Sequence, residues 1–131
     1  MKKVSNHQKT ILIVEDEPTL LELFADKFTN EGFHAFPTTT AEEGIKLALK
    51  NKPDFILLDI LLPKMDGISM LKILRKNPWG KSVPVIILSN VTDQKKVSEA
   101  MRLGVYDYIV KTDLVLNDLV NQVKGVTNIN C

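Results

Sequence analysis

The sequence predicts an α/β domain built on a doubly wound, five-stranded parallel sheet, (βα)5, in a three-layer sandwich. Five short apolar runs alternate with five segments of helical periodicity. Each run is continuously apolar, which is typical of parallel strands covered by helices on both faces. The 131 residues, 44% of them hydrophobic, suffice for one core and leave no room for a second domain.

The apolar runs are the expected strands, and a turn or capping signal follows each of them. The expected strands are residues 11–14, 33–36, 55–58, 85–88 and 106–110. The expected helix starts are Pro18, Thr40 with Glu43 in a capping box, Gly67, Thr92 or Asp93, and Thr112 or Asp113. Gly32 and Gly104 are expected to end the first and fourth helices.

The buried faces of the helices follow from apolar residues at helical spacing. In the second and fourth helices the residues expected to face the core are Ile45, Ala48, Leu49, Val97, Ala100 and Met101.

Polar residues stand at the carboxyl ends of four of the five expected strands, where open parallel sheets bind ligands. Glu15 and Asp16 follow the first strand, Asp59 the third, Ser89 the fourth and Lys111 the fifth. Each residue alone is more often a cap, a turn residue or a solvated surface group. Their gathering at one edge makes a functional site the better interpretation.

The composition limits the chemistry of this site. Seventeen basic residues balance sixteen acidic ones, so no global field favours nucleic acid or an anionic membrane. The one cysteine, Cys131, excludes an internal disulfide, and His7 and His34 have no companion ligands, so a metal would be held by oxygen. Neither a signal peptide nor a spanning apolar run is found, and we therefore expect a cytoplasmic protein without membrane insertion.

The acidic residues at this edge predict a magnesium site. Two carboxylates about 4 Å apart repel by about 1 kcal/mol in water and about 4 kcal/mol near a protein surface, so Glu15, Asp16 and Asp59 together require a cation. Mg²⁺ takes oxygen ligands and typically uses one or two carboxylates plus phosphate. With Lys111 and the Ser89 hydroxyl, the set forms a cradle in which Asp59 can accept a phosphoryl group as an acyl phosphate.

Four segments, ILIVEDEP, FILLDILLPKMDG, VIILSN and GVYDYIVK, resemble in order and spacing the receiver domain of response regulators in two-component signalling. The resemblance covers about residues 10–126. It implies a flavodoxin-like fold with strand order 2-1-3-4-5, and a single receiver domain over residues 1–131 whose tails, 1–9 and 127–131, are frayed.

The resemblance also implies the roles of the acidic residues. Asp59 is the phosphoacceptor, and the phosphoryl donor is a sensor histidine kinase or a histidine phosphotransfer protein. Asp16 and Asp59 bind Mg²⁺ directly together with the backbone carbonyl of Leu61, and Glu15 holds the metal through water. The domain catalyses only its own phosphorylation and dephosphorylation and is otherwise not an enzyme.

Three further residues receive roles in signal output from the resemblance. Ser89 and Lys111 contact the phosphoryl oxygens, and Tyr108 swings inward after phosphorylation. The face formed by the fourth helix, fifth strand and fifth helix then changes for a downstream protein, and homodimerisation on activation is compatible with it. Direct binding of nucleic acid is not expected.

The sequence departs from the family pattern at three places. Thr112 follows Lys111 where proline, often after a cis bond, is usual; a cis bond before a non-proline residue costs about 2.5 to 4 kcal/mol, which favours a trans bond and a different reach for the lysine. Asn90 replaces a very small residue and can crowd the phosphate or order water. Leu61 and Val91 offer no polar group to orient an attacking water, and we hypothesise a slowly hydrolysing acyl phosphate.

Three other functions compete with this interpretation of the sequence. A flavodoxin-like cofactor site needs a phosphate-cradling loop after the first strand, where Glu15-Asp16-Glu17 would repel phosphate. A magnesium-dependent phosphatase or nuclease needs a second acid two residues after Asp59, where Leu61 stands. A degenerate receiver that docks proteins without phosphorylation is the closest alternative, favoured by Thr112 and Asn90 and opposed by the intact acidic set.

Overall fold

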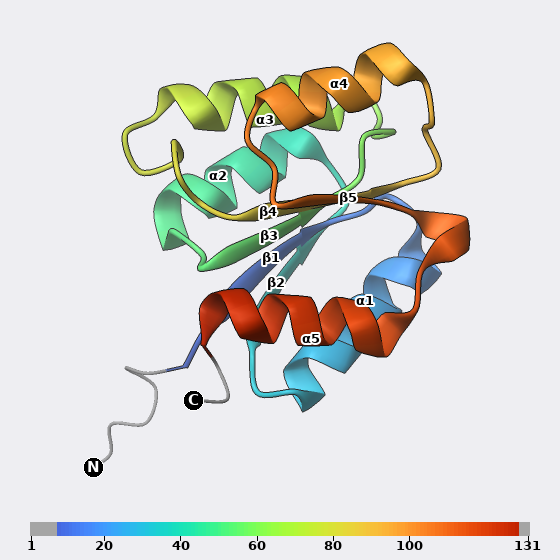
Figure 1. The fold of residues 1–131 in the computed structure, drawn as a ribbon. Coiled ribbons are helices and arrows are strands. Elements are labelled where there is room, and N and C mark those ends of the chain that lie inside the picture. Colours follow the sequence, from blue (N-terminus) through green and yellow to red (C-terminus); the bar gives the residue numbers. More distant parts are fainter. Residues whose placement is uncertain (1–7, 129–131) are drawn as a thin grey trace.

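The computed structural model describes residues 8–128, in which strands and helices alternate along the chain (Figure 1). The elements are β1 (Thr10–Val14), α1 (Pro18–Asn30), β2 (His34–Thr38), α2 (Ala41–Asn51), β3 (Phe55–Leu58), α3 (Gly67–Lys76), β4 (Val85–Ser89), α4 (Gln94–Arg102), β5 (Asp107–Val110), the 3₁₀ turn η2 (Lys111–Asp113) and α5 (Leu116–Thr127). The expected alternation of strands and helices is confirmed.

All neighbouring strands pair in parallel, in the order β2-β1-β3-β4-β5. Helices α1 and α5 cover one face of the sheet, and α2, α3 and α4 cover the other (Figure 1). The doubly wound, three-layer fold and its strand order are therefore confirmed. The order places β1 between β2 and β3, so the chain segments that leave β1 and β3 emerge side by side.

The apolar strands are buried on both faces because successive side chains point to opposite layers. Leu12 and Val14 pack in the core under α2, α3 and α4, whereas Ile11 and Ile13 pack in the core under α1 and α5. This explains why the strand sequences are continuously apolar instead of alternating.

Capping side chains begin helices α1 to α4 at the places that the sequence indicated. Thr40 Oγ1 accepts a hydrogen bond from the Glu43 N–H at 3.2 Å, and Asp93, not Thr92, caps α4 by accepting from the Lys95 N–H at 2.8 Å. Gly32 follows the end of α1 with φ of 98°, a conformation that glycine adopts without steric cost.

The start of α5 differs from the sequence-based expectation. Thr112 and Asp113 lie in the η2 turn, and α5 begins only at Leu116, preceded by Val115, which makes no side-chain capping bond. The cause is non-local: the Thr112 N–H donates to the side chain of Asn90, which holds the chain in a separate turn before the helix.

Two residues expected to face the core are largely exposed. Leu49 is 40% exposed and Met101 50% exposed. In both helices the preceding alanine, Ala48 or Ala100, is fully buried, and one further residue turns about 100° around the helix axis, away from the sheet. The small alanines let α2 and α4 approach the sheet closely.

The expected frayed tails, residues 1–9 and 127–131, lie largely outside the described residues. Within them, Thr127 is the last residue of α5 and is buried, with its hydroxyl donating to the Val123 carbonyl at 2.7 Å. Among residues 8–128, none of the helices combines the length and hydrophobicity that crossing a membrane requires.

Candidate functional site

The predicted site residues gather at the carboxyl ends of the strands, and the sheet itself places two of them side by side. The Asp59 N–H donates to the Val14 carbonyl at 3.0 Å, and the Glu15 N–H donates to the Thr38 carbonyl at 3.0 Å. Strand pairing thus continues one residue past β1 and β3. Glu15 and Asp59 are held by backbone hydrogen bonds and not by a mobile loop.

Glu15, Asp16 and Asp59 form a cluster in which one carboxylate oxygen from each lies within 4.8 Å of the others. Glu15 and Asp59 are 2% and 5% exposed, whereas Asp16 is exposed. Two carboxylates, those of Glu15 and Asp59, therefore lie buried at the bottom of the site. The Asp16 carboxylate lies at its solvent-exposed rim, from which a ligand can approach.

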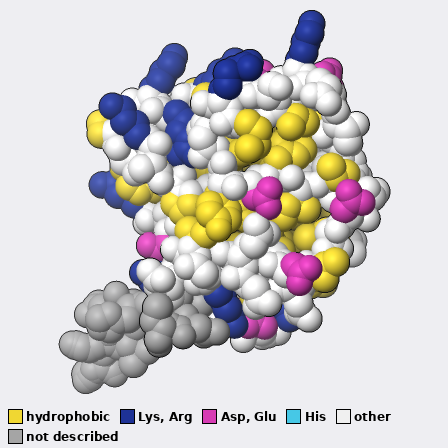
Figure 2. Space-filling model, viewed as in Figure 1, with side chains coloured by type: hydrophobic (Ala, Val, Ile, Leu, Met, Phe, Trp, Pro, Cys, Tyr) yellow, Lys and Arg dark blue, Asp and Glu magenta, His cyan; other side chains and the backbone are white. Residues whose placement is uncertain are grey.

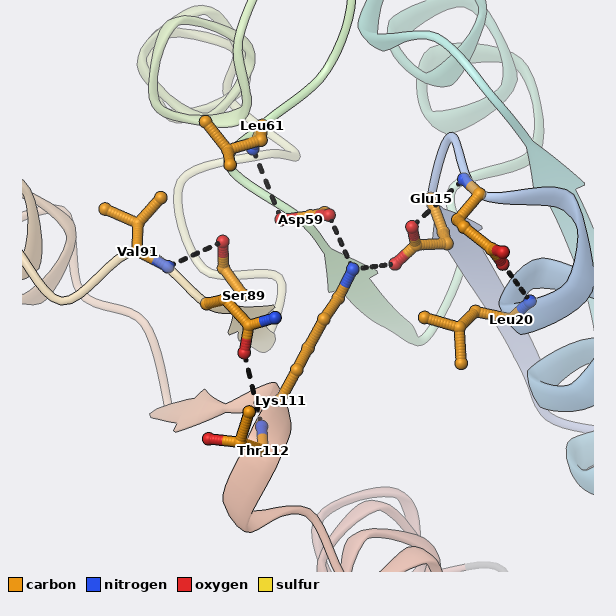
Figure 3. Close-up of polar contacts among 10 residues, drawn as sticks. Glu15, Leu20, Asp59, Leu61, Ser89, Val91, Lys111 and Thr112 are labelled. Carbon is orange, nitrogen blue, oxygen red and sulfur yellow. Dashed lines mark hydrogen bonds and ion pairs between the residues drawn. The ribbon is translucent and has the colours of Figure 1, made fainter.

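Lys111 bridges the two buried carboxylates (Figure 3). Its Nζ lies 2.8 Å from Asp59 Oδ2 and 2.7 Å from Glu15 Oε1. Burial alone would lower the pKa of Lys111, but hydrogen bonds and charges from Asp59 and Glu15 outweigh it and raise the pKa above its usual value. Lys111 therefore carries a positive charge beside the predicted phosphoacceptor.

Glu15 is the most strongly desolvated carboxyl for which a shift is resolved. Burial raises its pKa, and the nearby charge of Asp59 acts in the same direction, against the hydrogen bonds that Glu15 accepts from Lys111 and from the Glu17 N–H. A second cation near the cluster would relieve this cost, because it would favour the ionised carboxylate.

Ser89 and Tyr108 are connected through one residue of the β4–α4 loop. The Val91 N–H donates to the fully buried Ser89 Oγ at 3.4 Å, and the Tyr108 hydroxyl donates to the Val91 carbonyl. Burial, followed by the charge of Asp59, raises the pKa of Tyr108, so its hydroxyl stays protonated and remains a donor. Val91 therefore contacts both side chains.

Gly67 shapes the back of the site in a way that the sequence reading missed. A Cβ at this position would lie 2.2 Å from the Asp59 carbonyl oxygen, and the Gly67 N–H donates to the Ile60 carbonyl at 2.9 Å. A side chain at position 67 would clash with the backbone of Asp59 and displace it. The signal in the sequence was the Asp66-Gly67 pair, which was interpreted as the start of a helix and as the end of the FILLDILLPKMDG segment, without a role for Gly67 in the site.

Comparison with known proteins decides the family. The model of the response regulator receiver domain matches residues 11–124. The chain belongs to the receiver domain family.

The relatives of this receiver domain are longer proteins. It is 36% identical over 113 residues to a protein-glutamate methylesterase/protein-glutamine glutaminase of Archaeoglobus fulgidus, covering 83% of this chain and 31% of that protein. It is 36% identical over 101 residues to the KDP operon transcriptional regulatory protein KdpE of Escherichia coli, covering 77% and 44%. The chain thus spans less than half the length of these curated relatives.

Solved structures agree with this fold. The receiver domain of the Francisella response regulator 1452 superposes with a TM-score of 0.82 at 29% identity, covering 92% of this chain and 98% of that one. A CheY-like receiver domain protein from Methanospirillum hungatei gives a TM-score of 0.85 at 25% identity, covering 92% and 94%.

The peptide bond after Lys111 in this receiver domain is trans, since residues 8–128 contain no cis bonds. The lysine nevertheless reaches Asp59, so the threonine at 112 does not remove this contact. Asn90 turns its side-chain oxygen to the Thr112 N–H at 3.2 Å.

The mouth of the site carries an apolar side chain. Leu61 is 60% exposed, and its backbone N–H donates to Asp59 Oδ1 at 3.2 Å. Both oxygens of Asp59 therefore have a donor, Oδ1 from Leu61 and Oδ2 from Lys111, as the dashed lines in Figure 3 show.

The donor set suits Mg²⁺. Formally, three carboxylates face one ammonium group, which leaves two negative charges for a divalent cation to neutralise. All available ligand atoms are oxygens, and Asp16 at the rim provides one that is not engaged by Lys111.

Proposed function

We propose that this receiver domain is a phosphorylation switch in which Asp59 takes a phosphoryl group from a sensor histidine kinase or a histidine phosphotransfer protein. The observation that carries the proposal is the arrangement around Asp59: a buried carboxylate beside Glu15 and Asp16, with Lys111 at 2.8 Å. An isolated buried carboxylate would be costly, whereas this set matches the charge distribution of a phosphoryl group in transfer.

Asp16, Asp59 and the Leu61 carbonyl would hold Mg²⁺ directly, and Glu15 would hold it through water. When bound, the cation neutralises negative charge that builds up on the phosphoryl oxygens. The geometry of the cluster supports this assignment, because its oxygens lie within 4.8 Å of one another.

In the proposed reaction, Asp59 is the nucleophile. A carboxylate oxygen of Asp59 attacks the phosphorus of a phosphohistidine; the new P–O bond forms as the P–N bond breaks, and the donor imidazole leaves. Lys111 and Ser89 donate hydrogen bonds to the phosphoryl oxygens. These bonds would exclude water from one side of the phosphoryl group and would hold its phosphorus in line between the Asp59 oxygen and the leaving nitrogen. Lys111 would exchange its contact with Asp59 Oδ2 for one with the phosphoryl group.

The conformational change is proposed to start at Ser89. When its hydroxyl turns to the phosphoryl group, the hydrogen bond from Val91 is lost and the loop is drawn toward Asp59. Tyr108, bonded to the Val91 carbonyl, would follow inward. The coupling between such a site and its output face is typically about 1 to 3 kcal/mol.

The output face is proposed to consist of α4, β5 and α5. Three large side chains on or directly beside these elements are each at least 50% exposed: Met101 in α4, Tyr106 just before β5 and Val115 just before α5. Figure 2 shows hydrophobic side chains across this side of the molecule, interspersed with acidic ones and bordered by Lys and Arg. Such a surface fits a protein partner, or a second copy on activation, better than nucleic acid.

The remaining parts of the proposal concern the protein as a whole. Residues 1–131 would form one receiver domain with its core at about 10–126. The chain would act in the cytoplasm, because the proposed phosphodonor is a protein of intracellular signalling. Its role is regulatory, and the only chemistry proposed is its own phosphorylation and dephosphorylation.

The test is the intact mass of the protein after incubation with acetyl phosphate and Mg²⁺. The wild type should gain one phosphoryl group, and the gain should disappear in Asp59→Asn and on chelation of the metal. Asp54→Asn serves as a control, because Asp54 lies at the opposite end of β3 and should not affect the adduct. An adduct that survives Asp59→Asn would overturn the assignment, and a folded wild type that never gains phosphate would favour the degenerate receiver.

A further inference from the structure

Asn90 and Thr112 directly follow Ser89 and Lys111 in the sequence, and a hydrogen bond joins them. The Thr112 backbone N–H donates to Asn90 Oδ1 at 3.2 Å. Figure 3 shows this bond as the dashed line that ends on the backbone nitrogen of Thr112. It ties the loop after β4 to the η2 turn.

The bond extends the link between β4 and β5 past the end of the sheet. Strand pairing between β4 and β5 ends at Ser89 and Val110. The Lys111 backbone therefore lies between two fixed points: Val110, the last paired residue of β5, and the Thr112 N–H, which donates to Asn90. On the far side, the Leu114 N–H donates to the Lys111 carbonyl at 3.1 Å and closes the turn.

Lys111 needs such support, because its ammonium group stands on a flexible four-carbon stem. Its Nζ must reach Asp59 Oδ2 at 2.8 Å and Glu15 Oε1 at 2.7 Å from the turn that follows β5, the strand at the edge of the sheet. A small rotation of the backbone at residue 111 would carry the end of this long side chain away from both oxygens.

Residue 112 does not supply this restraint itself. Threonine leaves φ free where a proline ring would fix it, and it carries a backbone N–H that requires an acceptor. The Asn90 side chain provides that acceptor although it is exposed and 22 residues away in sequence.

We propose that Asn90 is a positioning residue for the phosphoryl-transfer site, and that it acts through the Thr112 N–H to hold Lys111 against Asp59. The inference rests on the proposed function and deepens it, since it identifies what places the lysine in this chain. It also connects the loop that carries Ser89 to the loop that carries Lys111.

The first test is the rate of phosphorylation by acetyl phosphate with Mg²⁺, followed by intact mass. Asn90→Ala should lower the rate about two- to fivefold, the range expected for losing one exposed hydrogen bond. Thr92→Ala, an exposed residue of the same loop, is the matched control and should leave the rate unchanged. If Asn90 instead only crowds the site, Asn90→Ala should be as fast as wild type or faster, which would overturn the proposal.

A double-mutant cycle separates positioning of Lys111 from a general structural role. In a Lys111→Met background, Asn90→Ala should cause no further loss of rate, because the side chain that it positions is gone. An equal loss in both backgrounds would contradict the proposal.

Amide hydrogen exchange reports on the bond itself. The Thr112 amide should exchange faster in Asn90→Ala than in wild type, while Asn90→Asp, which keeps an acceptor oxygen, should retain slow exchange. Unchanged exchange in Asn90→Ala would refute the contact. A wild type without any phosphoryl adduct would remove the proposed function, whereas a phosphorylated wild type with a fully active Asn90→Ala would remove only this inference.

Discussion

At the scale of single residues, the proposed chemistry depends on the groups that contact a buried carboxylate. Asp59 is 5% exposed, and its two oxygens accept hydrogen bonds from the Lys111 ammonium and the Leu61 N–H. Burial raises the pKa of Glu15. Formally, three carboxylates face the Lys111 ammonium group, so the cluster carries excess negative charge that a divalent cation would neutralise.

Leu61 gives the first prediction at this scale. Its 60% exposed side chain stands at the mouth of the site and has no group that could orient a water for attack on the acyl phosphate. Leu61→Asn should therefore shorten the lifetime of the phosphorylated protein, by about tenfold if the amide acts as a water-positioning group of ordinary strength.

The measurement is loss of the phosphoryl mass after removal of acetyl phosphate. Leu61→Met is the control, since it keeps an apolar side chain of similar size and should behave as wild type. Equal lifetimes for wild type and Leu61→Asn would refute the hypothesis of slow hydrolysis.

At the scale of elements, Arg75 joins three parts of the fold. From α3 its guanidinium donates to the Gly80 and Val83 carbonyls before β4, at 2.9 and 2.8 Å, and to the Leu103 and Gly104 carbonyls after α4, at 2.8 and 3.2 Å. These carbonyls lie after the end of α4 or before the start of β4, where helix and sheet provide no hydrogen-bond donor. Arg75 supplies the missing donors. It thereby fixes the end of α4 relative to α3.

We predict that Arg75→Met lowers the free energy of unfolding by about 2 to 4 kcal/mol, because it removes charge-assisted hydrogen bonds and leaves partly buried carbonyls without a donor. Urea unfolding followed by the fluorescence of Trp79 measures the change. Arg102→Met, which removes an exposed arginine from α4, should shift the midpoint little. A similar midpoint for Arg75→Met and Arg102→Met would contradict the role given to Arg75.

At the scale of the whole molecule, the parallel sheet brings residues far apart in sequence to one edge. Its order places β1 and β3 next to each other, so Glu15 and Asp59 meet, and it places β5 at the margin, where Lys111 reaches inward. The path from the site to the outer face is short: Ser89 is bonded to Val91, and Val91 to Tyr108. These two hydrogen bonds connect the strand ends with Tyr108 of β5.

The fold could be predicted from the sequence because its signals are local. Continuous apolar runs mark strands buried on both faces, and the Thr40 and Asp93 caps mark helix starts. The start of α5 could not be predicted, because the bond from Thr112 to Asn90 depends on two loops that meet only in the folded chain.

The composition of the site could be predicted for a similar reason. Carboxyl ends of parallel strands share one edge, so the strand pattern alone places Glu15, Asp59 and Lys111 together. The bridging of both carboxylates by Lys111 and the close approach of Gly67 to the Asp59 carbonyl could not be predicted, because they depend on side-chain direction and backbone spacing in three dimensions.

In the proposed function, the carboxylate of Asp59, and no other group, accepts the phosphoryl group. Borohydride reduces an acyl phosphate to an alcohol, so a phosphorylated aspartate becomes homoserine, which peptide mass spectrometry can locate. After phosphorylation with Mg²⁺ present, we predict homoserine at position 59 alone. Reduction at Asp16 or Glu15, or a phosphoryl group that resists borohydride and maps to Ser89, would contradict the account.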